Sequence, residues 1–266
     1  MTKHTDCRVC GDRSPGIGEY RLLDRYDVAY FRCDTCGFLQ TETPHWLEIA
    51  YESPITRSDI GLVQRNLDLA RSTQLLINWC FDRRARFLDY AGGYGLLVRL
   101  LRDRGFDFHL YEPFTDNLFA QGFQIEDAPF ENDRFEVVTA FEVLEHLEHP
   151  VQHIENMLSV SDAIFATTTL YPEDSNPLKA EWDYLAPETG QHIAFFSSRT
   201  FRYIADRYGL QYNSYGGVFH LLTKRRINPL LFAGICSYRT RGLLGFKNWF
   251  GDSLIESDLD RVKNDG

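Results

Sequence analysis

The feature that most constrains the fold is a glycine-rich turn between an apolar segment and a helical pattern. The stretch is Phe87-Leu88-Asp89-Tyr90-Ala91-Gly92-Gly93-Tyr94-Gly95-Leu96-Leu97. It reads as a strand that ends on a carboxylate, a turn, and the start of a helix. Glycine lets backbone approach a ligand closely, and the N–H groups at a helix start attract polar groups. The turn therefore predicts a cofactor cradle, although such turns also occur as plain connections.

Strand and helix patterns alternate after this turn. They predict a helix over 96–104, a strand over 106–111, a helix over 117–121, short or full strands over 123–125, 135–140 and 163–169, a serine-capped helix over 197–208, and closing strands over 211–215 and 218–224. This rhythm indicates a doubly wound, Rossmann-like α/β fold whose ligand crevice lies at the carboxyl ends of the strands. Asp89 and Glu112 end successive strands, and a carboxylate at the second position is suited to a ribose.

Four of the six cysteines form two C-x-x-C pairs near the start of the chain: Cys7 with Cys10, and Cys33 with Cys36. A glycine follows each pair, and roughly twenty residues separate the pairs, which is the spacing of a four-cysteine zinc site. Disulfides or a redox pair are the alternative, but neither a secretion signal nor a thioredoxin-like context accompanies them. Residues 19–32 alternate and predict the strands of a zinc ribbon. With so few apolar residues, this module needs a structural Zn²⁺ to fold.

The chain has 266 residues, enough for one sizeable α/β domain with a small appendage. We expect a zinc ribbon over 1–45, a linker and entry helix over 46–80, the cofactor-binding domain over 81–226, and a tail over 227–266. No apolar run is long enough for a bilayer and the polar start is unlike a secretion signal, so a cytoplasmic protein is expected. A net charge of −10 argues against nucleic acid as a partner. The basic run Lys224-Arg225-Arg226 is interpreted as a solvated strand end.

Several of these motifs, in order, resemble the class I S-adenosylmethionine-dependent methyltransferases. They are Asp89-x-Ala91-x-Gly93-x-Gly95 with Glu112, and Phe135-Glu136-Val137-Val138 leading to Glu142-Val143-Leu144-Glu145-His146-Leu147. The resemblance covers residues 67–226 and implies a seven-stranded sheet. It departs at Ala91, where the family usually has its first glycine. A nicotinamide dinucleotide is the rival cofactor, but its glycine fingerprint differs from this single tight loop.

The resemblance implies a role for each cofactor residue. Asp89 and the backbone of Ala91, Gly92, Gly93 and Gly95 would contact the methionine portion, Glu112 with its neighbour Pro113 the ribose, Asp127 and Ala128 the adenine, and Phe141 and Glu142 the surroundings of the sulfonium. Together with the ribbon, the region of Tyr51 and the run Gln191-His192 resemble methyltransferases that act on nucleotide-linked deoxysugars. The expected acceptor is therefore a nucleotide-linked sugar or similar small molecule, in surface-polysaccharide or natural-product biosynthesis.

Methyl transfer to a hydroxyl needs a base near the methyl group. His192 is our first choice, because imidazole titrates near neutral pH and this residue lies on the loop expected to cover the site. Tyr171 is a second candidate that would orient the acceptor. Each also has a plain alternative, a hydrogen-bonded histidine and a packed tyrosine. Glu142, Glu145 and His146 share one face of a short helix, where they either hold a divalent ion or brace the crevice floor.

Two other functions stay open at this point. Some ribosomal RNA base methyltransferases also carry a four-cysteine module, but the acidic charge argues against this reading. A non-catalytic, cofactor-binding scaffold is the alternative from another class, and the complete set of Asp89, Gly93, Gly95 and Glu112 argues against it. The tail, with Phe232, Trp249 and Phe250, is expected to pack on the substrate face or to form a homodimer contact.

Overall fold

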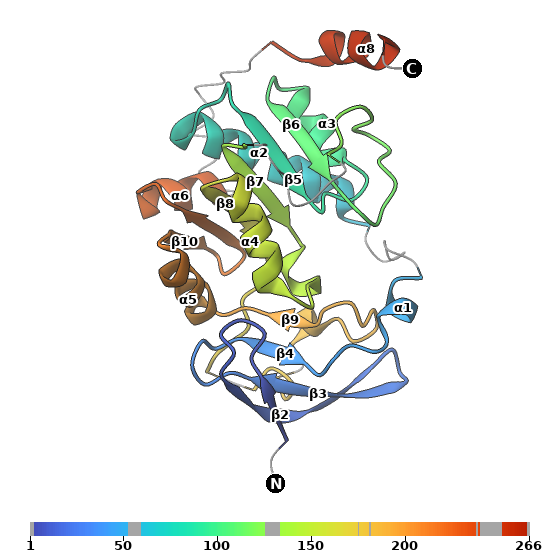
Figure 1. The fold of residues 1–266 in the computed structure, drawn as a ribbon, viewed down its shortest axis with the longest axis vertical. Helices are drawn as coiled ribbons and strands as arrows, with labels where there is room; N and C mark the ends of the chain where they lie inside the picture. Colours follow the sequence, from blue (N-terminus) through green and yellow to red (C-terminus); the bar gives the residue numbers. More distant parts are fainter. Residues whose placement is uncertain are drawn as a thin grey trace.

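The computed structural model describes residues 3–52, 60–125, 134–174, 176–180, 182–237, 239 and 252–264. Its centre is a six-stranded mixed sheet with the order β10-β11-β8-β7-β5-β6 (Figure 1). The strands are β5 (Arg86–Tyr90), β6 (Asp107–Tyr111), β7 (Val137–Phe141), β8 (Ala163–Thr167), β10 (Gln211–Tyr215) and β11 (Phe219–Thr223). The four strands from β6 to β8 are parallel, and the closing hairpin of β10 and β11 runs antiparallel. The carboxyl ends of β5, β6, β7 and β8 therefore meet at one edge.

The expected seventh strand, over 123–125, is reduced to a single parallel bridge between Leu110 and Gln124. The backbone of Leu110 pairs with Phe123 at 2.8 Å and with Ile125 at 2.7 Å, and the segment beyond residue 125 lies outside the described residues. The expected helix over 117–121 is also wrong. The Asn117 side chain bonds both the N–H and the carbonyl of Ala120, each at 2.8 Å, and so competes with helical backbone pairing.

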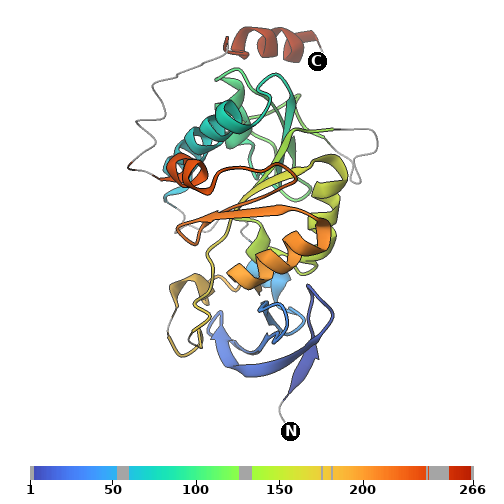
Figure 2. The same cartoon turned by 90° about the vertical axis from the view of Figure 1, so that its left-hand side faces the viewer.

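Helices cover both faces of the sheet, as a doubly wound fold requires. One face carries α2 (Leu62–Cys80), α3 (Leu96–Arg102) and α6 (Pro229–Cys236), and the other carries α4 (Pro150–Val160) and α5 (Ser198–Tyr208) (Figure 2). Successive residues of β5 point to opposite faces of the sheet: Phe87 packs with α2, α3 and α6, and Leu88 packs with α4 and α5. The predicted serine cap is confirmed, because Ser197 accepts a hydrogen bond from the Thr200 N–H.

A second sheet, of five strands, lies at one end of the molecule (Figure 1). Its order is β1 (His4–Asp6), β2 (Arg13–Leu22), β3 (Tyr26–Arg32), β4 (Leu39–Thr41) and β9 (Ala194–Phe195). Three short elements connect the two sheets. In the chain, α1 (Leu47–Ala50) and η2 (Asp183–Leu185) each lie between a strand of one sheet and a strand of the other. The third, η1 (Leu144–His146), follows β7 and is hydrogen-bonded to the segment before β9. Because β9 comes from the segment after β8, the N-terminal sheet is completed by residues far outside the expected module of 1–45.

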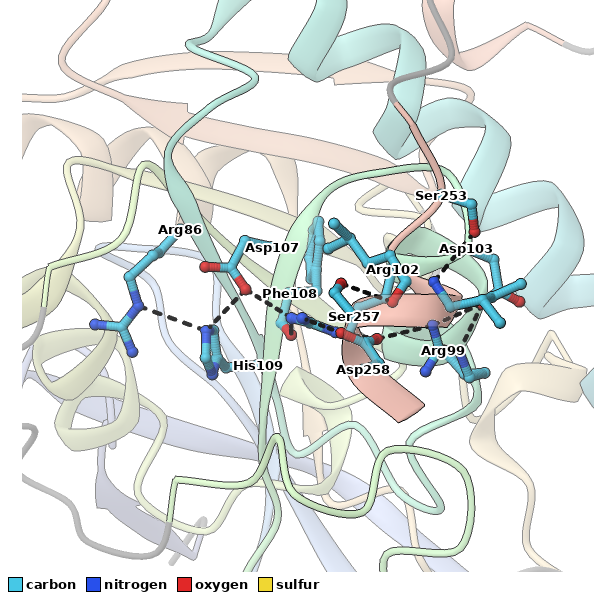
Figure 3. A network of polar contacts seen from close by, with 12 residues as sticks. Arg86, Arg99, Arg102, Asp103, Asp107, Phe108, His109, Ser253, Ser257 and Asp258 are labelled. Carbon is cyan, nitrogen blue, oxygen red and sulfur yellow. Dashed lines mark hydrogen bonds and ion pairs between the residues drawn. The ribbon is translucent and has the colours of Figure 1, made fainter. Parts of the chain in front are cut away.

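The last helix, α8 (Ile255–Asn264), lies at the opposite end of the molecule (Figure 1). Arg102 donates from Nε and Nη2 to the two carboxylate oxygens of Asp258, at 2.8 Å each, and both side chains are buried (Figure 3). The Arg102 guanidinium also lies 3.7 Å from the ring centroid of Phe123. Within the expected tail over 227–266, α8 thus packs on α3 and the β6 edge, whereas α6 packs on the sheet face that carries α2. None of the described helices is both long enough and apolar enough to cross a membrane.

Candidate functional site

The carboxylate that ends β5 is buried beneath the glycine turn. Asp89 is 2% exposed, and its Oδ1 accepts a hydrogen bond of 2.6 Å from the Thr139 hydroxyl on the neighbouring strand β7. Burial raises the pKa of Asp89 to about 7; the Thr139 bond opposes this shift and the charge of Glu112 adds to it. An acid that titrates near neutral pH at a strand end is typical of a binding site.

The turn has no room for side chains where it passes over Asp89. A β-carbon on Gly92 would lie 2.2 Å from Asp89 Oδ2, and one on Gly95, at φ +80°, would lie 2.9 Å from the β-carbon of Ala120. Ala91 has φ +54°, a left-handed conformation in which glycine is favoured, so the family's usual glycine has a physical reason here. Larger residues at Gly92 or Gly95 would therefore collide with Asp89 or Ala120, so the turn needs glycine at both positions to keep its shape.

Glu112 joins the turn to the end of β6. The carboxylate is 7% exposed and accepts backbone hydrogen bonds from Gly93 at 2.9 Å, Phe114 at 2.8 Å and Thr115 at 3.2 Å. The structure thus brings Asp89, Gly93 and Glu112 together, as the sequence predicted. Pro113 follows Glu112 and is exposed, while Asp127 and Ala128 lie outside the described residues.

Two site residues come from the end of β7. Phe141 packs its ring edge against Phe165, with centroids 5.1 Å apart. Glu142 has φ +54° and accepts a hydrogen bond of 2.7 Å from the hydroxyl of Thr167, at the end of β8. Burial and the nearby charge of Glu145 raise the pKa of Glu142. The chain therefore turns sharply here and presents carboxylates at the crevice edge.

A group of an acid and two histidines follows on η1 and the loop before β9. Glu145, His146 and His192 each offer one ligand atom, and these atoms lie within 4.8 Å of one another. We call this group the acid–histidine cluster. The Ile193 N–H donates to the Glu145 carbonyl oxygen at 2.9 Å, which fixes the His192 loop beside η1. His192 thus lies beside Glu145 and His146, and its ring centroid is 4.9 Å from that of His146.

The hydrogen bonds of the cluster define its chemistry. His192 Nδ1 lies 2.6 Å from the carbonyl oxygen of Tyr184, and because a carbonyl only accepts, Nδ1 carries the proton and Nε2 keeps a lone pair. The Tyr184 hydroxyl donates to Glu145 Oε1, while Oε2 accepts no hydrogen bond from the described residues. Burial raises the pKa of Glu145 and lowers that of His146 to about 3.

Of the tyrosines, Tyr171 lies away from the acid–histidine cluster, whereas Tyr51 and Tyr184 contact it. The Tyr171 hydroxyl donates to the Gly37 carbonyl oxygen at 2.5 Å, and the ring is buried beside the N-terminal sheet. Its contacts are with that sheet, and it does not join the acid–histidine cluster. Tyr51 does, since its hydroxyl lies 3.0 Å from His146 Nδ1. Tyr184 was missed as a site residue, because no sequence signal beyond its place in the aromatic loop connects it to Glu145.

The four cysteines expected to bind zinc lie together. One sulfur of each lies within 4.8 Å of the others, with Cys7 and Cys36 3.5 Å apart and Cys10 and Cys33 3.4 Å apart. These distances exceed the roughly 2.05 Å of a disulfide bond. They approach the roughly 3.8 Å between sulfurs that surround a tetrahedral ion at about 2.3 Å. Gly11 and Gly37, with φ +81° and +72°, complete the two turns, so the donor set suits Zn²⁺.

Comparison with known proteins agrees with this geometry. Residues 63–215, more than half of the chain, match the family described as a methyltransferase domain. No curated protein matches the sequence. The chain therefore belongs to the S-adenosylmethionine-dependent methyltransferases.

Solved structures share the fold at low identity. An O-methyltransferase family protein from Burkholderia thailandensis is 15% identical with a TM-score of 0.50, and the match covers 68% of this chain and 62% of that one. The calicheamicin biosynthesis methyltransferase CalO1, bound to SAH, is 14% identical with a TM-score of 0.45, and the match covers 62% and 54%. Mitomycin 7-O-methyltransferase is 17% identical with a TM-score of 0.48, and the match covers 68% and 60%. This chain thus spans less than two thirds of each of these structures.

Proposed function

We propose that this protein transfers a methyl group from S-adenosylmethionine to a hydroxyl of a small polar acceptor, a nucleotide-linked sugar, beside the acid–histidine cluster. The observation that carries the proposal is the joint placement of Asp89, Gly93 and Glu112 at one sheet edge, with Glu142 at the end of the adjacent strand β7 and the His192 loop held beside η1. Parallel α/β sheets bind their ligands at this edge.

The residues present fit the cofactor. The space where a β-carbon of Gly93 would stand is open to a ligand, and Glu112 keeps acceptor capacity beyond its three backbone bonds, because a carboxylate has about four lone-pair sites. Glu112 would hold the ribose, the Ala91–Gly95 backbone the methionine portion, and Asp127 and Ala128 the adenine. When bound, the cofactor supplies a methyl group already activated on a sulfonium.

His192 would accept the proton of the attacking hydroxyl. Its Nδ1 is held by the Tyr184 carbonyl, so that Nε2 is the available base. Glu145 lies beside the ring and would stabilise the imidazolium formed. Tyr51 and Tyr184 flank the two histidines with aromatic surface, which suits a sugar ring. A structural Zn²⁺ on Cys7, Cys10, Cys33 and Cys36 would hold the N-terminal sheet, whose strand β9 directly follows His192 and Ile193.

Two measurements test the proposal. Isothermal calorimetry with S-adenosylmethionine should show one binding event per chain, and its absence would overturn the function. A mass-shift assay with the cofactor and a panel of nucleotide-linked sugars should then give a product heavier by one methylene unit. Binding of the cofactor with no product from any sugar would remove the sugar and leave the methyltransferase.

A further inference from the structure

We propose that the acid–histidine cluster is a metal site in which Glu145, His146 and His192 bind one divalent transition-metal ion. The sequence alone left open whether Glu142, Glu145 and His146 hold a divalent ion or brace the crevice floor. The structure exchanges Glu142 for His192, because the Glu142 carboxylate accepts from Thr167 while His192 lies against Glu145 and His146. Two imidazoles and one carboxylate form a known donor set for zinc and for iron.

Both imidazoles are oriented as metal ligands usually are. His192 Nδ1 lies 2.6 Å from the Tyr184 carbonyl oxygen. His146 Nδ1 lies 3.2 Å from the Gln191 carbonyl oxygen and 3.0 Å from the Tyr51 hydroxyl, which can accept as well as donate. A histidine that ligates a metal typically donates its other ring N–H to such a carbonyl, which directs the lone pair of the remaining nitrogen toward the ion. The two carbonyl oxygens therefore favour a proton on Nδ1 in both rings, which leaves Nε2 as the ligand atom.

The Glu145 carboxylate also has one oxygen held by the protein and one oxygen available to an ion. Glu145 is fully buried, Tyr184 donates to its Oε1, and Oε2 has no partner among the described residues. A buried carboxylate oxygen without a partner is strongly unfavourable, and the charge of Glu142 nearby adds repulsion. A divalent cation between Oε2 and the two Nε2 atoms would remove both penalties. The unpaired Oε2 atom therefore supports a metal ion at this place independently of the clustering of the three side chains.

Three protein ligands leave open positions, which is the arrangement of catalytic and not of structural metal sites. The consequence for chemistry rests on the proposed function: an acceptor hydroxyl that coordinates the ion would lose its proton more easily. His192 then serves as a ligand in the metal-loaded protein and as a base in the metal-free protein, because both roles use the Nε2 lone pair. Binding of the ion itself does not depend on methyl transfer.

The test uses the full chain with zinc retained in the cysteine site. After removal of loosely bound metal, Co²⁺ is titrated by calorimetry and by visible absorption. We expect one additional Co²⁺ per chain, without the thiolate-to-cobalt charge-transfer band that binding at the cysteines would produce. Glu145→Gln and His146→Gln should abolish this binding. Tyr184→Phe, which removes only the hydrogen bond to Glu145 Oε1, should weaken it by about tenfold.

Matched controls come from the same loop. Glu148 and His149 are the same residue types three positions further on, and His149 is exposed. Glu148→Gln and His149→Gln should leave Co²⁺ affinity unchanged, and the circular dichroism of every variant should match that of the parent. Absence of the additional Co²⁺, or equal Co²⁺ binding in Glu145→Gln, would overturn the metal site. S-adenosylmethionine binding, measured separately, tests the proposed function independently of either result.

Discussion

The backbone N–H of Gly93 donates a 2.9 Å hydrogen bond to Glu112, so the residue proposed to bind ribose also holds the glycine turn. The same carboxylate accepts from Phe114 and Thr115 at the end of β6. Binding and loop order are therefore coupled at this position. Removing the side chain has two effects, and a pair of variants is needed to separate them.

Glu112→Ala should weaken S-adenosylmethionine binding by about tenfold or more, because it removes a charged acceptor and leaves backbone donors unpaired. Glu112→Gln retains an amide oxygen for Phe114 and Thr115 and should therefore disturb the loop less than Glu112→Ala does. Its affinity for the cofactor should still be lower than that of the parent. Calorimetry measures both affinities, with Asp116→Asn on the adjacent exposed loop as control. Undiminished affinity in Glu112→Gln would remove the ribose assignment.

The pKa of Asp89, raised to about 7 by burial, predicts a pH-dependent stability. Between the ordinary value of 3.8 and about 7, the folded state holds a proton that the unfolded state has lost. Stability from this group is therefore complete below about pH 4 and is lost as the pH rises to about 7. Asp89→Asn should abolish this part of the pH dependence.

Urea unfolding of both proteins between pH 5 and 8 measures this difference. The stability of the parent relative to Asp89→Asn should fall with rising pH and become constant above about pH 7, with a change on the order of 3 kcal/mol between pH 5 and pH 8. A difference that does not vary with pH would show that Asp89 is ionised throughout.

Cys33→Ser should lower the zinc content of the purified protein from one ion per chain to nearly none, because the site loses one of four thiolates. The N-terminal sheet should lose stability with it. Cys80→Ser is the matched control, since Cys80 lies outside the group of four cysteines. Elemental analysis measures the metal, and full retention in Cys33→Ser would exclude four-thiolate binding.

Asp258→Asn should release α8 from the body of the protein. The change breaks a buried, two-point ion pair and leaves the Arg102 guanidinium without its main partner. Breaking such a pair costs about 3 kcal/mol, and the loss cannot exceed the free energy with which α8 docks on the protein. Limited proteolysis should then cut near α8 faster than in the parent. Asp260→Asn, an exposed aspartate of the same helix, should behave as the parent. Equal cleavage of the two variants would contradict the role of the pair.

His192→Ala should lower turnover by about 100-fold or more and leave S-adenosylmethionine affinity nearly unchanged, because the residue acts on the acceptor. Steady-state kinetics and calorimetry provide the two readouts. His149→Ala, an exposed histidine near η1, is the control. Unaltered turnover would place the base elsewhere.

Local patterns in the sequence determined the elements and the cofactor edge. The alternation of apolar residues predicted β5, β6, β7, β8 and the closing hairpin, and the glycines predicted the cradle, because period and turn chemistry are properties of neighbouring residues. The spacing of the cysteine pairs likewise predicted the cluster of four sulfurs now seen. The helix over 117–121 failed because the Asn117 side chain forms local bonds that periodicity does not register.

Only the tertiary structure decided which distant residues meet. His192 lies beside Glu145 because β9 joins the N-terminal sheet and the Ile193 N–H bonds the Glu145 carbonyl, two contacts between residues far apart in the sequence. Tyr171 contacts Gly37, and Asp258 contacts Arg102, for the same kind of reason. Such contacts depend on how sheets and helices pack, whereas sequence periodicity reports only which side of an element is apolar. The glycine turn was therefore predictable from the sequence, whereas the meeting of Glu145, His146 and His192 was not.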